Sequence, residues 1–328
     1  MTNTTTYQKL TWPLFLELIR LPAKAASLLP FLFGTLYAYY AFNEFNWLNS
    51  LIYFIGQMSI ALFVTGFNNV QDYYKAKDLA YRDRDNILGR EHLNPRRIMA
   101  LMMFFLVLAC AMGLLLVIRT NLILLFIGGL AILVAITYTA GPIPLSRMPL
   151  GEILSGTCEG FGTIFIAAYV NMTDQLPMAM FFHGWDVLIS FNLAVILQLF
   201  VVGASFLLLD SGIMFADNIC DLEQDQRNQR YTLPYYLGKR RALKAYPYVP
   251  GAALACVLIS ILIGWLPWLM IVIFGLIPLV IKHVRIFLAK QDKRTTFNTA
   301  IQNMLAIDTA QVVVLAIVNG YLIWRNGR

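Results

Sequence analysis

The sequence predicts an all-α polytopic membrane protein, and three observations support that prediction. Of the 328 residues, 59% are hydrophobic and only 13% are charged, whereas a soluble domain has about 25% charged residues. The mean hydropathy is +0.65. Apolar runs long enough to cross a bilayer as helices recur along the whole chain. This composition excludes a water-soluble globule, a disordered chain and a secreted disulfide scaffold.

Nine segments have the length and apolarity of a membrane span, which needs about 17–25 residues. In chain order the expected spans are 25–42, 50–70, 98–118, 121–139, 151–170, 187–209, 248–265, 267–284 and 303–324. The fifth is diluted by Glu152, Glu159 and several glycines. We expect residues 1–328 to form a single integral-membrane domain.

Basic residues set the expected orientation. With the N-terminus on the cytoplasmic side, the 25 Lys and Arg all fall on cytoplasmic segments and flanks, except Arg119, Arg325 and Arg328. Positive residues concentrate on the cytoplasmic side of membrane proteins. The net charge of +7 is therefore a topology signal, and no nucleic-acid partner is expected. Because no cleavable signal or targeting peptide is recognisable, we expect a bacterial plasma membrane, with the C-terminus outside.

Two similar acidic motifs close the second and sixth expected spans. Residues 68–72 read Asn-Asn-Val-Gln-Asp and residues 217–221 read Asp-Asn-Ile-Cys-Asp, as in a two-part internal repeat. Positions four apart lie only ~40° apart around a helix. Asp217 and Asp221 therefore share a face, with Asp225 one turn further along.

The first motif extends beyond its helical pentad. Asn68 and Asp72 share a face by the same spacing, but Asp78 lies six residues beyond Asp72, ~120° around a continuous helix. We therefore expect the helix to break between these two aspartates if both serve one site.

Carboxylate and amide oxygens in two such clusters suit a hard cation such as Mg²⁺, which usually binds a few carboxylates together with substrate phosphates. The pattern predicts a metal-bridged polyphosphate between the two helix ends. The competing interpretation, solvated helix caps, fits one cluster better than two matching ones. Basic residues follow both motifs, although positive-inside bias explains most of them. Asp210 and Asp308 are further intramembrane acids; Asp210 could line the cavity, and the role of Asp308 is open.

These residues resemble the UbiA superfamily of intramembrane aromatic prenyltransferases, over most of the chain. Within it, the branch that acts on 1,4-dihydroxy-2-naphthoate in menaquinone biosynthesis is the most similar. The spacing from Asp72 to Asp78, the segment 138–144 with 150–152, and the residues 221–225, 230–233 and 237–238 support that branch. Three positions depart from its pattern: Asp217 stands in place of a common asparagine, Arg230 in place of a lysine, and Gln229 in place of a glycine.

The resemblance implies a UbiA-like bundle with a central cavity capped by cytoplasmic loops, and a set of roles. The implied Mg²⁺ ligands are Asn68, Asp72, Asp78, Asp217, Asp221 and Asp225. The implied diphosphate-binding residues are Lys24, Arg82 and Arg230. Asp72, Asp221 and Tyr138 are the implied catalytic residues, with Tyr138 facing an allylic cation. A polyprenyl diphosphate would donate its chain to dihydroxynaphthoate, with loss of CO₂ and diphosphate.

Two alternatives stay open. The acceptor could be 4-hydroxybenzoate or another phenol, although the Asp72–Asp78 spacing argues against this. A cation transporter could also carry intramembrane acids. Transporters place ion sites near the midplane on broken helices, whereas these acids cluster at span ends beside basic residues.

Overall fold

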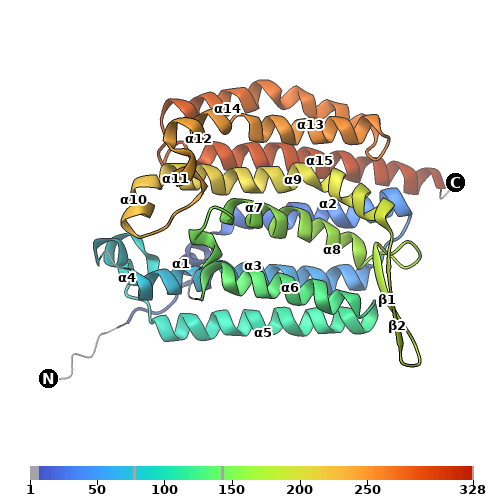
Figure 1. Cartoon of the computed structure of the whole chain (residues 1–328), viewed down its shortest axis with the longest axis horizontal. Helices are drawn as coiled ribbons and strands as arrows, with labels where there is room; N and C mark the ends of the chain where they lie inside the picture. Colours follow the sequence, from blue (N-terminus) through green and yellow to red (C-terminus); the bar gives the residue numbers. More distant parts are fainter. Residues whose placement is uncertain (1–6, 77–78, 142–143, 327–328) are drawn as a thin grey trace.

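The computed structural model describes residues 7–76, 79–141 and 144–326. Its long helices lie side by side along one direction (Figure 1). Seven helical stretches of the described residues are long and apolar enough to cross a membrane. They are α2 (Ala25–Phe42), α3 (Trp47–Lys75), α5 (Pro95–Arg119), α9 (Leu193–Cys220), α12 (Lys239–Ala245) with α13 (Tyr248–Leu262), η5 (Trp268–Leu276) with α14 (Ile277–Ala289), and α15 (Asn298–Asn326). The fold class expected from the sequence is therefore present, as a mostly helical membrane protein.

The fourth and fifth expected spans are less regular, so the count of nine stays a prediction. The fourth is a shorter apolar helix, α6 (Ile123–Thr139). The fifth is built from three consecutive pieces: α7 (Gly151–Ser155), the π-helical η4 (Gly156–Gly162) and α8 (Thr163–Tyr169).

The glycines that dilute the fifth span are packing positions. A Cβ on Gly156 would lie 2.1 Å from the Leu207 carbonyl oxygen of α9, and one on Gly160 would lie 2.7 Å from the Leu207 nitrogen. Small residues let helix backbones approach closely inside membranes. The loss of hydropathy in this span therefore reflects close contact between η4 and α9.

The sixth expected span differs from the structure at both ends. Residues 187–191, assigned to that span, instead belong to a β-hairpin of β1 (Met178–His183) and β2 (Asp186–Phe191). The helix starts at Leu193, where the Asn192 side chain accepts a hydrogen bond from the Val195 nitrogen, and it continues to Cys220. Periodicity alone does not distinguish a strand from a helix in a short apolar run, whereas an Asn N-cap marks the start of a helix.

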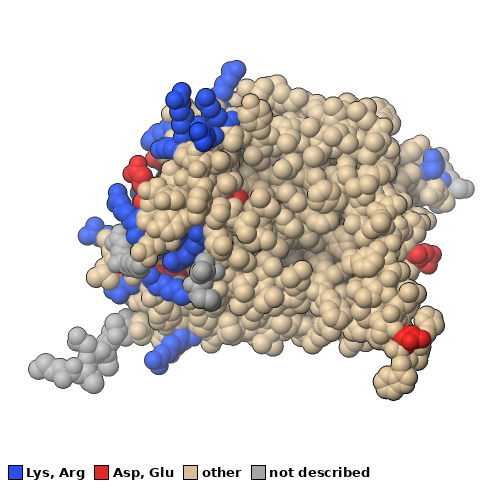
Figure 2. Space-filling view, viewed as in Figure 1, with Lys and Arg blue, Asp and Glu red and all other residues tan. Residues whose placement is uncertain are grey.

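Short elements connect the long helices. They are α1 (Trp12–Leu18), η1 (Leu21–Lys24), η2 (Tyr81–Asp85), α4 (Ile87–Arg90), η3 (Leu145–Arg147), α10 (Leu222–Arg227) and α11 (Leu233–Leu237). In Figure 1, α4, α10, α11 and α12 lie at one end of the bundle, and Figure 2 shows Lys and Arg gathered at that end. The hairpin and the end of α15 lie at the other end. The bundle is therefore strongly polarised in charge along its helices.

The long helices of the bundle pack against one another around a buried core. α3 runs along α5, α9 packs against η4 and α13, and α2 packs against α8 and α15. Phe33 of α2 and Phe206 of α9 have ring centroids 4.7 Å apart in the buried core. By contrast, Phe104, Val107 and Leu262 are exposed apolar side chains on the bundle surface, as lipid-facing positions require.

Candidate active site

The second acidic motif winds from the end of α9 into α10. Asp221 caps α9, its backbone nitrogen donating to the Asp217 carbonyl at 3.0 Å, and the Asp225 nitrogen donates to the Asp221 carbonyl at 2.8 Å. The three aspartates therefore follow one another at single-turn intervals, as the spacing predicts. Asp225 is buried, and its Oδ2 has no hydrogen-bond partner among the described residues.

A lysine from a distant loop binds this motif. Lys293 lies between α14 and α15, and its Nζ lies 2.9 Å from Asp217 Oδ1 and also pairs with Asp221. The neighbouring Asp292 shapes the loop, because its Oδ1 accepts hydrogen bonds from the Arg294 and Thr295 nitrogens at 3.0 Å each. Sequence reasoning treated Lys293 only as part of the positive-inside set. Its place in the predicted loop after the eighth span, which faces the same side as both motifs, was the available signal.

Arg230 links the two motifs. Its Nε lies 3.5 Å from Asp225 Oδ1, and its backbone nitrogen donates to the Asp225 carbonyl at 2.8 Å. Its charge also acts on Asp72, Asp217 and Asp221. One guanidinium therefore stands within electrostatic range of carboxylates from both motifs, which are separated by about half the chain.

The chain adopts a left-handed turn at Gln229, immediately before Arg230. Gln229 has a φ of 57°, in the left-handed region that glycine adopts without strain. The chain needs this turn so that the Arg230 nitrogen can reach the Asp225 carbonyl. Glycine, the residue usual at this position in the branch, suits the same turn.

The first motif ends α3. Asn68 Nδ2 donates to Asp72 Oδ2 at 3.3 Å, on one helix face as the spacing predicts. α3 ends at Lys75, so the helix stops before Asp78, as expected if both aspartates serve one site. Asp78 itself lies outside the described residues.

The asparagine shared by both motifs is structural in each. Asn69 Nδ2 donates to the Leu18 carbonyl at 2.9 Å, and the Asn69 carbonyl accepts from Asn86 Nδ2. Asn218 Nδ2 donates to Glu152 Oε1 at 2.7 Å, and the same oxygen accepts from the Leu233 nitrogen at 3.1 Å. The second position of each motif thus fastens neighbouring segments around the aspartates.

The cations nearest Asp72 differ in part from the expected set. The basic side chains that act electrostatically on the Asp72 carboxylate are, in decreasing order of effect, Arg230, Arg147, Arg20 and Lys293. Arg147 lies in η3, where its carbonyl accepts a hydrogen bond from the Tyr231 nitrogen at 3.0 Å, next to Arg230. Arg147 was not recognised from the sequence as a site residue, because it follows a different span.

Two of the three expected diphosphate-binding residues lie away from this cluster. Lys24 is buried and donates to the Ala61 carbonyl at 2.8 Å and to Thr65 Oγ1 at 2.6 Å, about two turns along α3 from Asp72. Arg82 instead pairs with Asp83, Nε to Oδ1 at 2.7 Å, with its guanidinium 5.8 Å from the Tyr73 ring centroid. Arg230 alone of the three lies among the aspartates.

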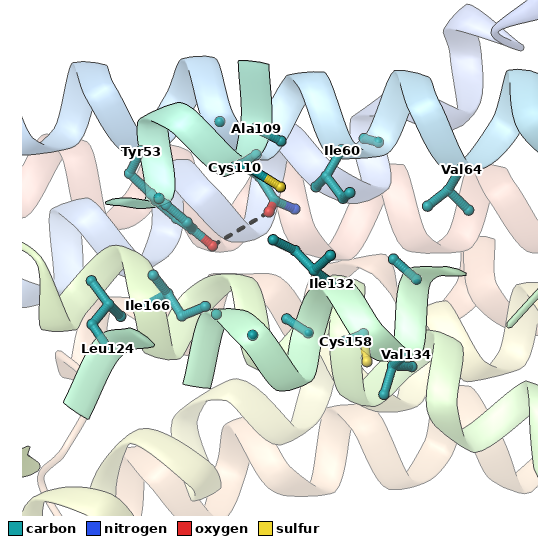
Figure 3. Close-up of a pocket in the computed structure, with 18 of the residues that line it drawn as sticks. Tyr53, Ile60, Val64, Ala109, Cys110, Leu124, Ile132, Val134, Cys158 and Ile166 are labelled. Carbon is teal, nitrogen blue, oxygen red and sulfur yellow. Dashed lines mark hydrogen bonds between the residues drawn. The ribbon is translucent and has the colours of Figure 1, made fainter. Parts of the chain in front are cut away.

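Tyr138 stands between the charged cluster and an apolar cavity. Its hydroxyl donates to the Gly151 carbonyl at 3.4 Å, and it lies within electrostatic range of Arg230 and Asp217. It also lines a cavity of about 410 Å³ formed by α3, α5, α6 and the helical segments around η4. Figure 3 shows Tyr53 and Ile60 of α3 facing this space opposite Ile132 of α6. The lining is almost wholly apolar.

The intramembrane acids are deeply buried. Both carboxylate oxygens of Asp210 lack a hydrogen-bond partner among the described residues. Asp308 accepts from Gln311 Nε2 at 3.4 Å, and Gln311 in turn accepts from Ser205. Asp308 is thus part of a hydrogen-bond chain between α15 and α9. Glu159, one of the residues that dilute the fifth expected span, lines the apolar cavity.

The donor chemistry of the cluster fits magnesium. The two acidic motifs supply carboxylate and amide oxygens around Arg230. Asp225 Oδ2 is buried and has no hydrogen-bond partner among the described residues. Across the ranges 7–76, 79–141 and 144–326, no three His, Cys, Asp or Glu side chains form a metal site by themselves. Magnesium usually completes its coordination with substrate phosphates and water, so such a site requires the diphosphate as well.

Comparisons with known proteins agree with this architecture. The chain is 25% identical over 277 residues to the 1,4-dihydroxy-2-naphthoate octaprenyltransferase of Bacillus subtilis (strain 168), covering 84% of this chain and 82% of that one. A UbiA homologue from Aeropyrum pernix K1, solved in its apo form, superposes with a TM-score of 0.66 at 20% identity, over 88% of this chain and 97% of the other. A UbiA homologue from Archaeoglobus fulgidus, bound to GPP and Mg²⁺, gives 0.62 at 14% identity, over 94% and 99%. Residues 27–306 match the model of the UbiA prenyltransferase family, and the chain is therefore an integral-membrane prenyltransferase of that family.

Proposed function

We propose that this enzyme transfers a polyprenyl group from polyprenyl diphosphate to 1,4-dihydroxy-2-naphthoate, giving demethylmenaquinol, CO₂ and diphosphate. The observation that carries the reaction type is Arg230, whose charge acts on aspartates of both motifs beside Tyr138 and an apolar cavity. The acceptor is supported by the Bacillus subtilis relative and by the Asp72–Asp78 spacing.

The diphosphate would bind where the two motifs approach one another. The proposed Mg²⁺ ligands are Asn68, Asp72, Asp78, Asp217, Asp221 and Asp225. When bound, Mg²⁺ would supply Lewis-acid stabilisation of the departing diphosphate. Arg230 and Lys293 would neutralise the remaining diphosphate oxygens by charge-assisted hydrogen bonds. Lys24 and Arg82, the other expected diphosphate ligands, require side-chain or loop movement to join them.

The prenyl chain would occupy the apolar cavity, with its reactive end near Tyr138. The bond between the allylic carbon and the diphosphate oxygen breaks, and the ring face of Tyr138 stabilises the resulting cation by ~0.5–2 kcal/mol. The electron-rich naphthoate ring then attacks that carbon, and loss of its carboxylate as CO₂ restores aromaticity. An apolar product can pass sideways between helices into lipid, which accounts for a membrane location.

Charge polarity supports a proposed orientation. Lys and Arg gather at the end of the bundle that holds α4, α10, α11 and α12 (Figure 2). By the positive-inside bias, this end and the N-terminus face the cytoplasm, and α15 ends outside. The plasma membrane remains the location expected from the sequence.

The acceptor is tested with membranes carrying this protein, Mg²⁺ and farnesyl or longer prenyl diphosphate. Dihydroxynaphthoate and 4-hydroxybenzoate are offered side by side, with Asp72→Asn and Asp221→Asn as controls. Prenylated naphthoquinol that disappears with EDTA and in both variants supports the proposal. Prenylated hydroxybenzoate alone keeps the reaction type and rejects the acceptor. Family membership already disfavours a cation transporter, and diphosphate release would exclude it.

A further inference from the structure

The β1–β2 hairpin is an apolar element that is exposed over most of its length. Every residue from 181 to 194 is exposed. The large apolar side chains among them are Phe181, Phe182, Trp185, Val187, Leu188, Ile189, Phe191 and Leu193. Trp185, at the tip, is fully exposed. A run of this kind in water is unusual, because large exposed apolar patches mark interaction sites.

Each face of the hairpin carries exposed apolar pairs. Phe181 pairs with Leu188, and Phe182 pairs with Val187. Because successive strand residues point to opposite faces, these two pairs lie on different faces of the hairpin. A protein partner docking on one face would leave the other in water, whereas lipid can contact both.

The hairpin is fixed at its base and projects from the bundle. Asn121 brackets Met180, its Nδ2 donating to the Met180 carbonyl at 3.0 Å and its Oδ1 accepting from the Met180 nitrogen at 2.9 Å. The Tyr169 hydroxyl donates to the Met178 carbonyl at 3.1 Å. In Figure 1 the hairpin runs across the helix ends, toward and past the end of α5. Its direction is therefore across the helices, along the plane of a bilayer.

The depth of the hairpin follows from its backbone. A two-stranded hairpin has two open edges, and unpaired backbone groups are excluded from the hydrocarbon core. The same hairpin is at best marginally stable in water. The interfacial layer satisfies both constraints, since water reaches the edges while the side chains contact lipid.

Other aromatic residues mark the same level. Trp47 begins α3, ~37 Å along the helix from Asp72, and is exposed. Trp268 and Trp324 are exposed at the corresponding ends of η5 and α15. Exposed Trp residues at one level form the aromatic belt of a membrane interface, and Trp185 continues that belt.

We propose that the β1–β2 hairpin lies in the interfacial layer of the bilayer on the side opposite the aspartates, with lipid on both of its faces. Residues 178–191 contain no Lys or Arg, so apolar burial rather than attraction to anionic headgroups holds the hairpin there. This inference is independent of the acceptor or metal.

The test places an environment-sensitive NBD label at Trp185→Cys in the full-length protein, with the four native cysteines replaced by alanine. The protein is reconstituted in phosphatidylcholine vesicles, alone or with phosphatidylglycerol. Matched controls carry the label at Leu130→Cys on α6, expected in the hydrocarbon region, and at Tyr236→Cys on α11, expected in water; both native side chains are exposed. A melting profile and a far-ultraviolet circular dichroism spectrum that match those of the wild type confirm folding of each labelled protein.

We expect lipid nitroxides at the headgroup or high on the acyl chain to quench the label at 185 more than nitroxides near the chain end. Iodide should quench it far less than the label at 236, and phosphatidylglycerol should change nothing. Strong iodide quenching without lipid quenching would put the hairpin in water and overturn the proposal. Protection from both quenchers that is lost on dilution into excess lipid would mean that a second copy of the chain covers the hairpin, and would overturn the proposal. Quenching that requires phosphatidylglycerol would overturn the apolar mechanism.

Discussion

Lys293 Nζ lies 2.9 Å from Asp217 Oδ1, and this contact joins the loop before α15 to the end of α9. The same ammonium pairs with Asp221. A cation supplied by the protein thus sits on two carboxylates that are proposed to hold a divalent metal. On the proposed function, Lys293 would compete with the metal for these oxygens and would contact a bound diphosphate.

Lys293→Gln is expected to strengthen metal binding and to weaken binding of the prenyl diphosphate. Without the competing ammonium, Mn²⁺ or Mg²⁺ should bind the substrate-free protein several-fold more tightly, a modest change because the Lys293 side chain is 42% exposed. The KM for prenyl diphosphate should rise several-fold through loss of a charge-assisted contact. Metal binding by titration calorimetry and steady-state kinetics measure the two effects. Lys290→Gln is the control, since Lys290 pairs with Asp292; equal behaviour of both variants would remove Lys293 from the site.

Arg230→Ala is expected to lower kcat/KM for the prenyl donor about 100-fold, because removal of one preorganised charge-stabilising donor typically costs 10²–10³ in rate. The variant should also unfold more readily, because it leaves Asp225 buried without its cation. Arg230→Lys, which restores the residue usual in the branch, should recover much of the activity and much of the stability. Arg227→Ala, at an exposed position nearby, is the matched control. An Arg230→Ala enzyme with unchanged donor kinetics would contradict the assigned role.

Metal affinity should depend on pH through Asp225. Burial raises the pKa of Asp225 to about 6, against the opposing effect of Arg230. A proton must leave before the carboxylate binds a cation, so Mg²⁺ affinity should fall as the pH drops below about 6, by at most tenfold per unit for one proton. Half-saturating Mg²⁺, measured across this range in wild type and in Asp225→Asn, checks the prediction. A wild-type dependence that persists unchanged in Asp225→Asn would assign the proton to another group.

The same pKa has a consequence for stability in the absence of metal. An unfolded aspartate titrates near pH 3.9, so between about pH 4 and about pH 6 the folded protein holds more protons than the unfolded chain. The contribution of Asp225 to the free energy of unfolding is therefore highest at low pH and decreases as the pH rises through that window. Detergent-solubilised wild type and Asp225→Asn, melted in EDTA, should differ most above pH ~6, with the asparagine variant the more stable. An equal difference at all pH values would exclude this cause.

Tyr138 is predicted to act through its ring. Tyr138→Phe keeps the aromatic face and loses only a 3.4 Å hydrogen bond, so turnover should stay within a few-fold. Tyr138→Ala should lose about 2- to 30-fold in kcat, the equivalent of ~0.5–2 kcal/mol of cation–π stabilisation. Single-turnover rates with saturating donor separate this effect from binding. A phenylalanine variant as slow as the alanine variant would assign the role to the hydroxyl.

Much of the site follows from periodicity, and the remainder from contacts that sequence spacing does not encode. Asn68 and Asp72 share a face because helix geometry is local, whereas a helix end before Asp78 was expected only on the condition that both aspartates serve one site. The approach of Lys293 and Arg147 to the aspartates depends on how distant loops pack. The structural roles of Asn69 and Asn218 were likewise hidden, since only their long-range partners distinguish them from metal ligands.

The fold shows the same division between local and tertiary information. Long apolar runs located α2, α3, α5 and α15 because span length is set by the bilayer. The hairpin at 178–191 was not predicted, because the hydrophobic periodicity of a short apolar run does not distinguish a strand from a helix. The fifth span looked weak because its glycines serve contact with α9 rather than lipid.

The central claim is that the motifs of α3 and α9 build one metal–diphosphate site. A double-mutant cycle tests it most directly, using Mg²⁺-dependent binding of an unreactive prenyl thiodiphosphate to wild type, Asp72→Asn, Asp221→Asn and the double variant. For one shared site, the losses should be non-additive by ~0.5 kcal/mol or more. Losses that add within experimental error would mean that the two motifs bind separately, and would contradict the account.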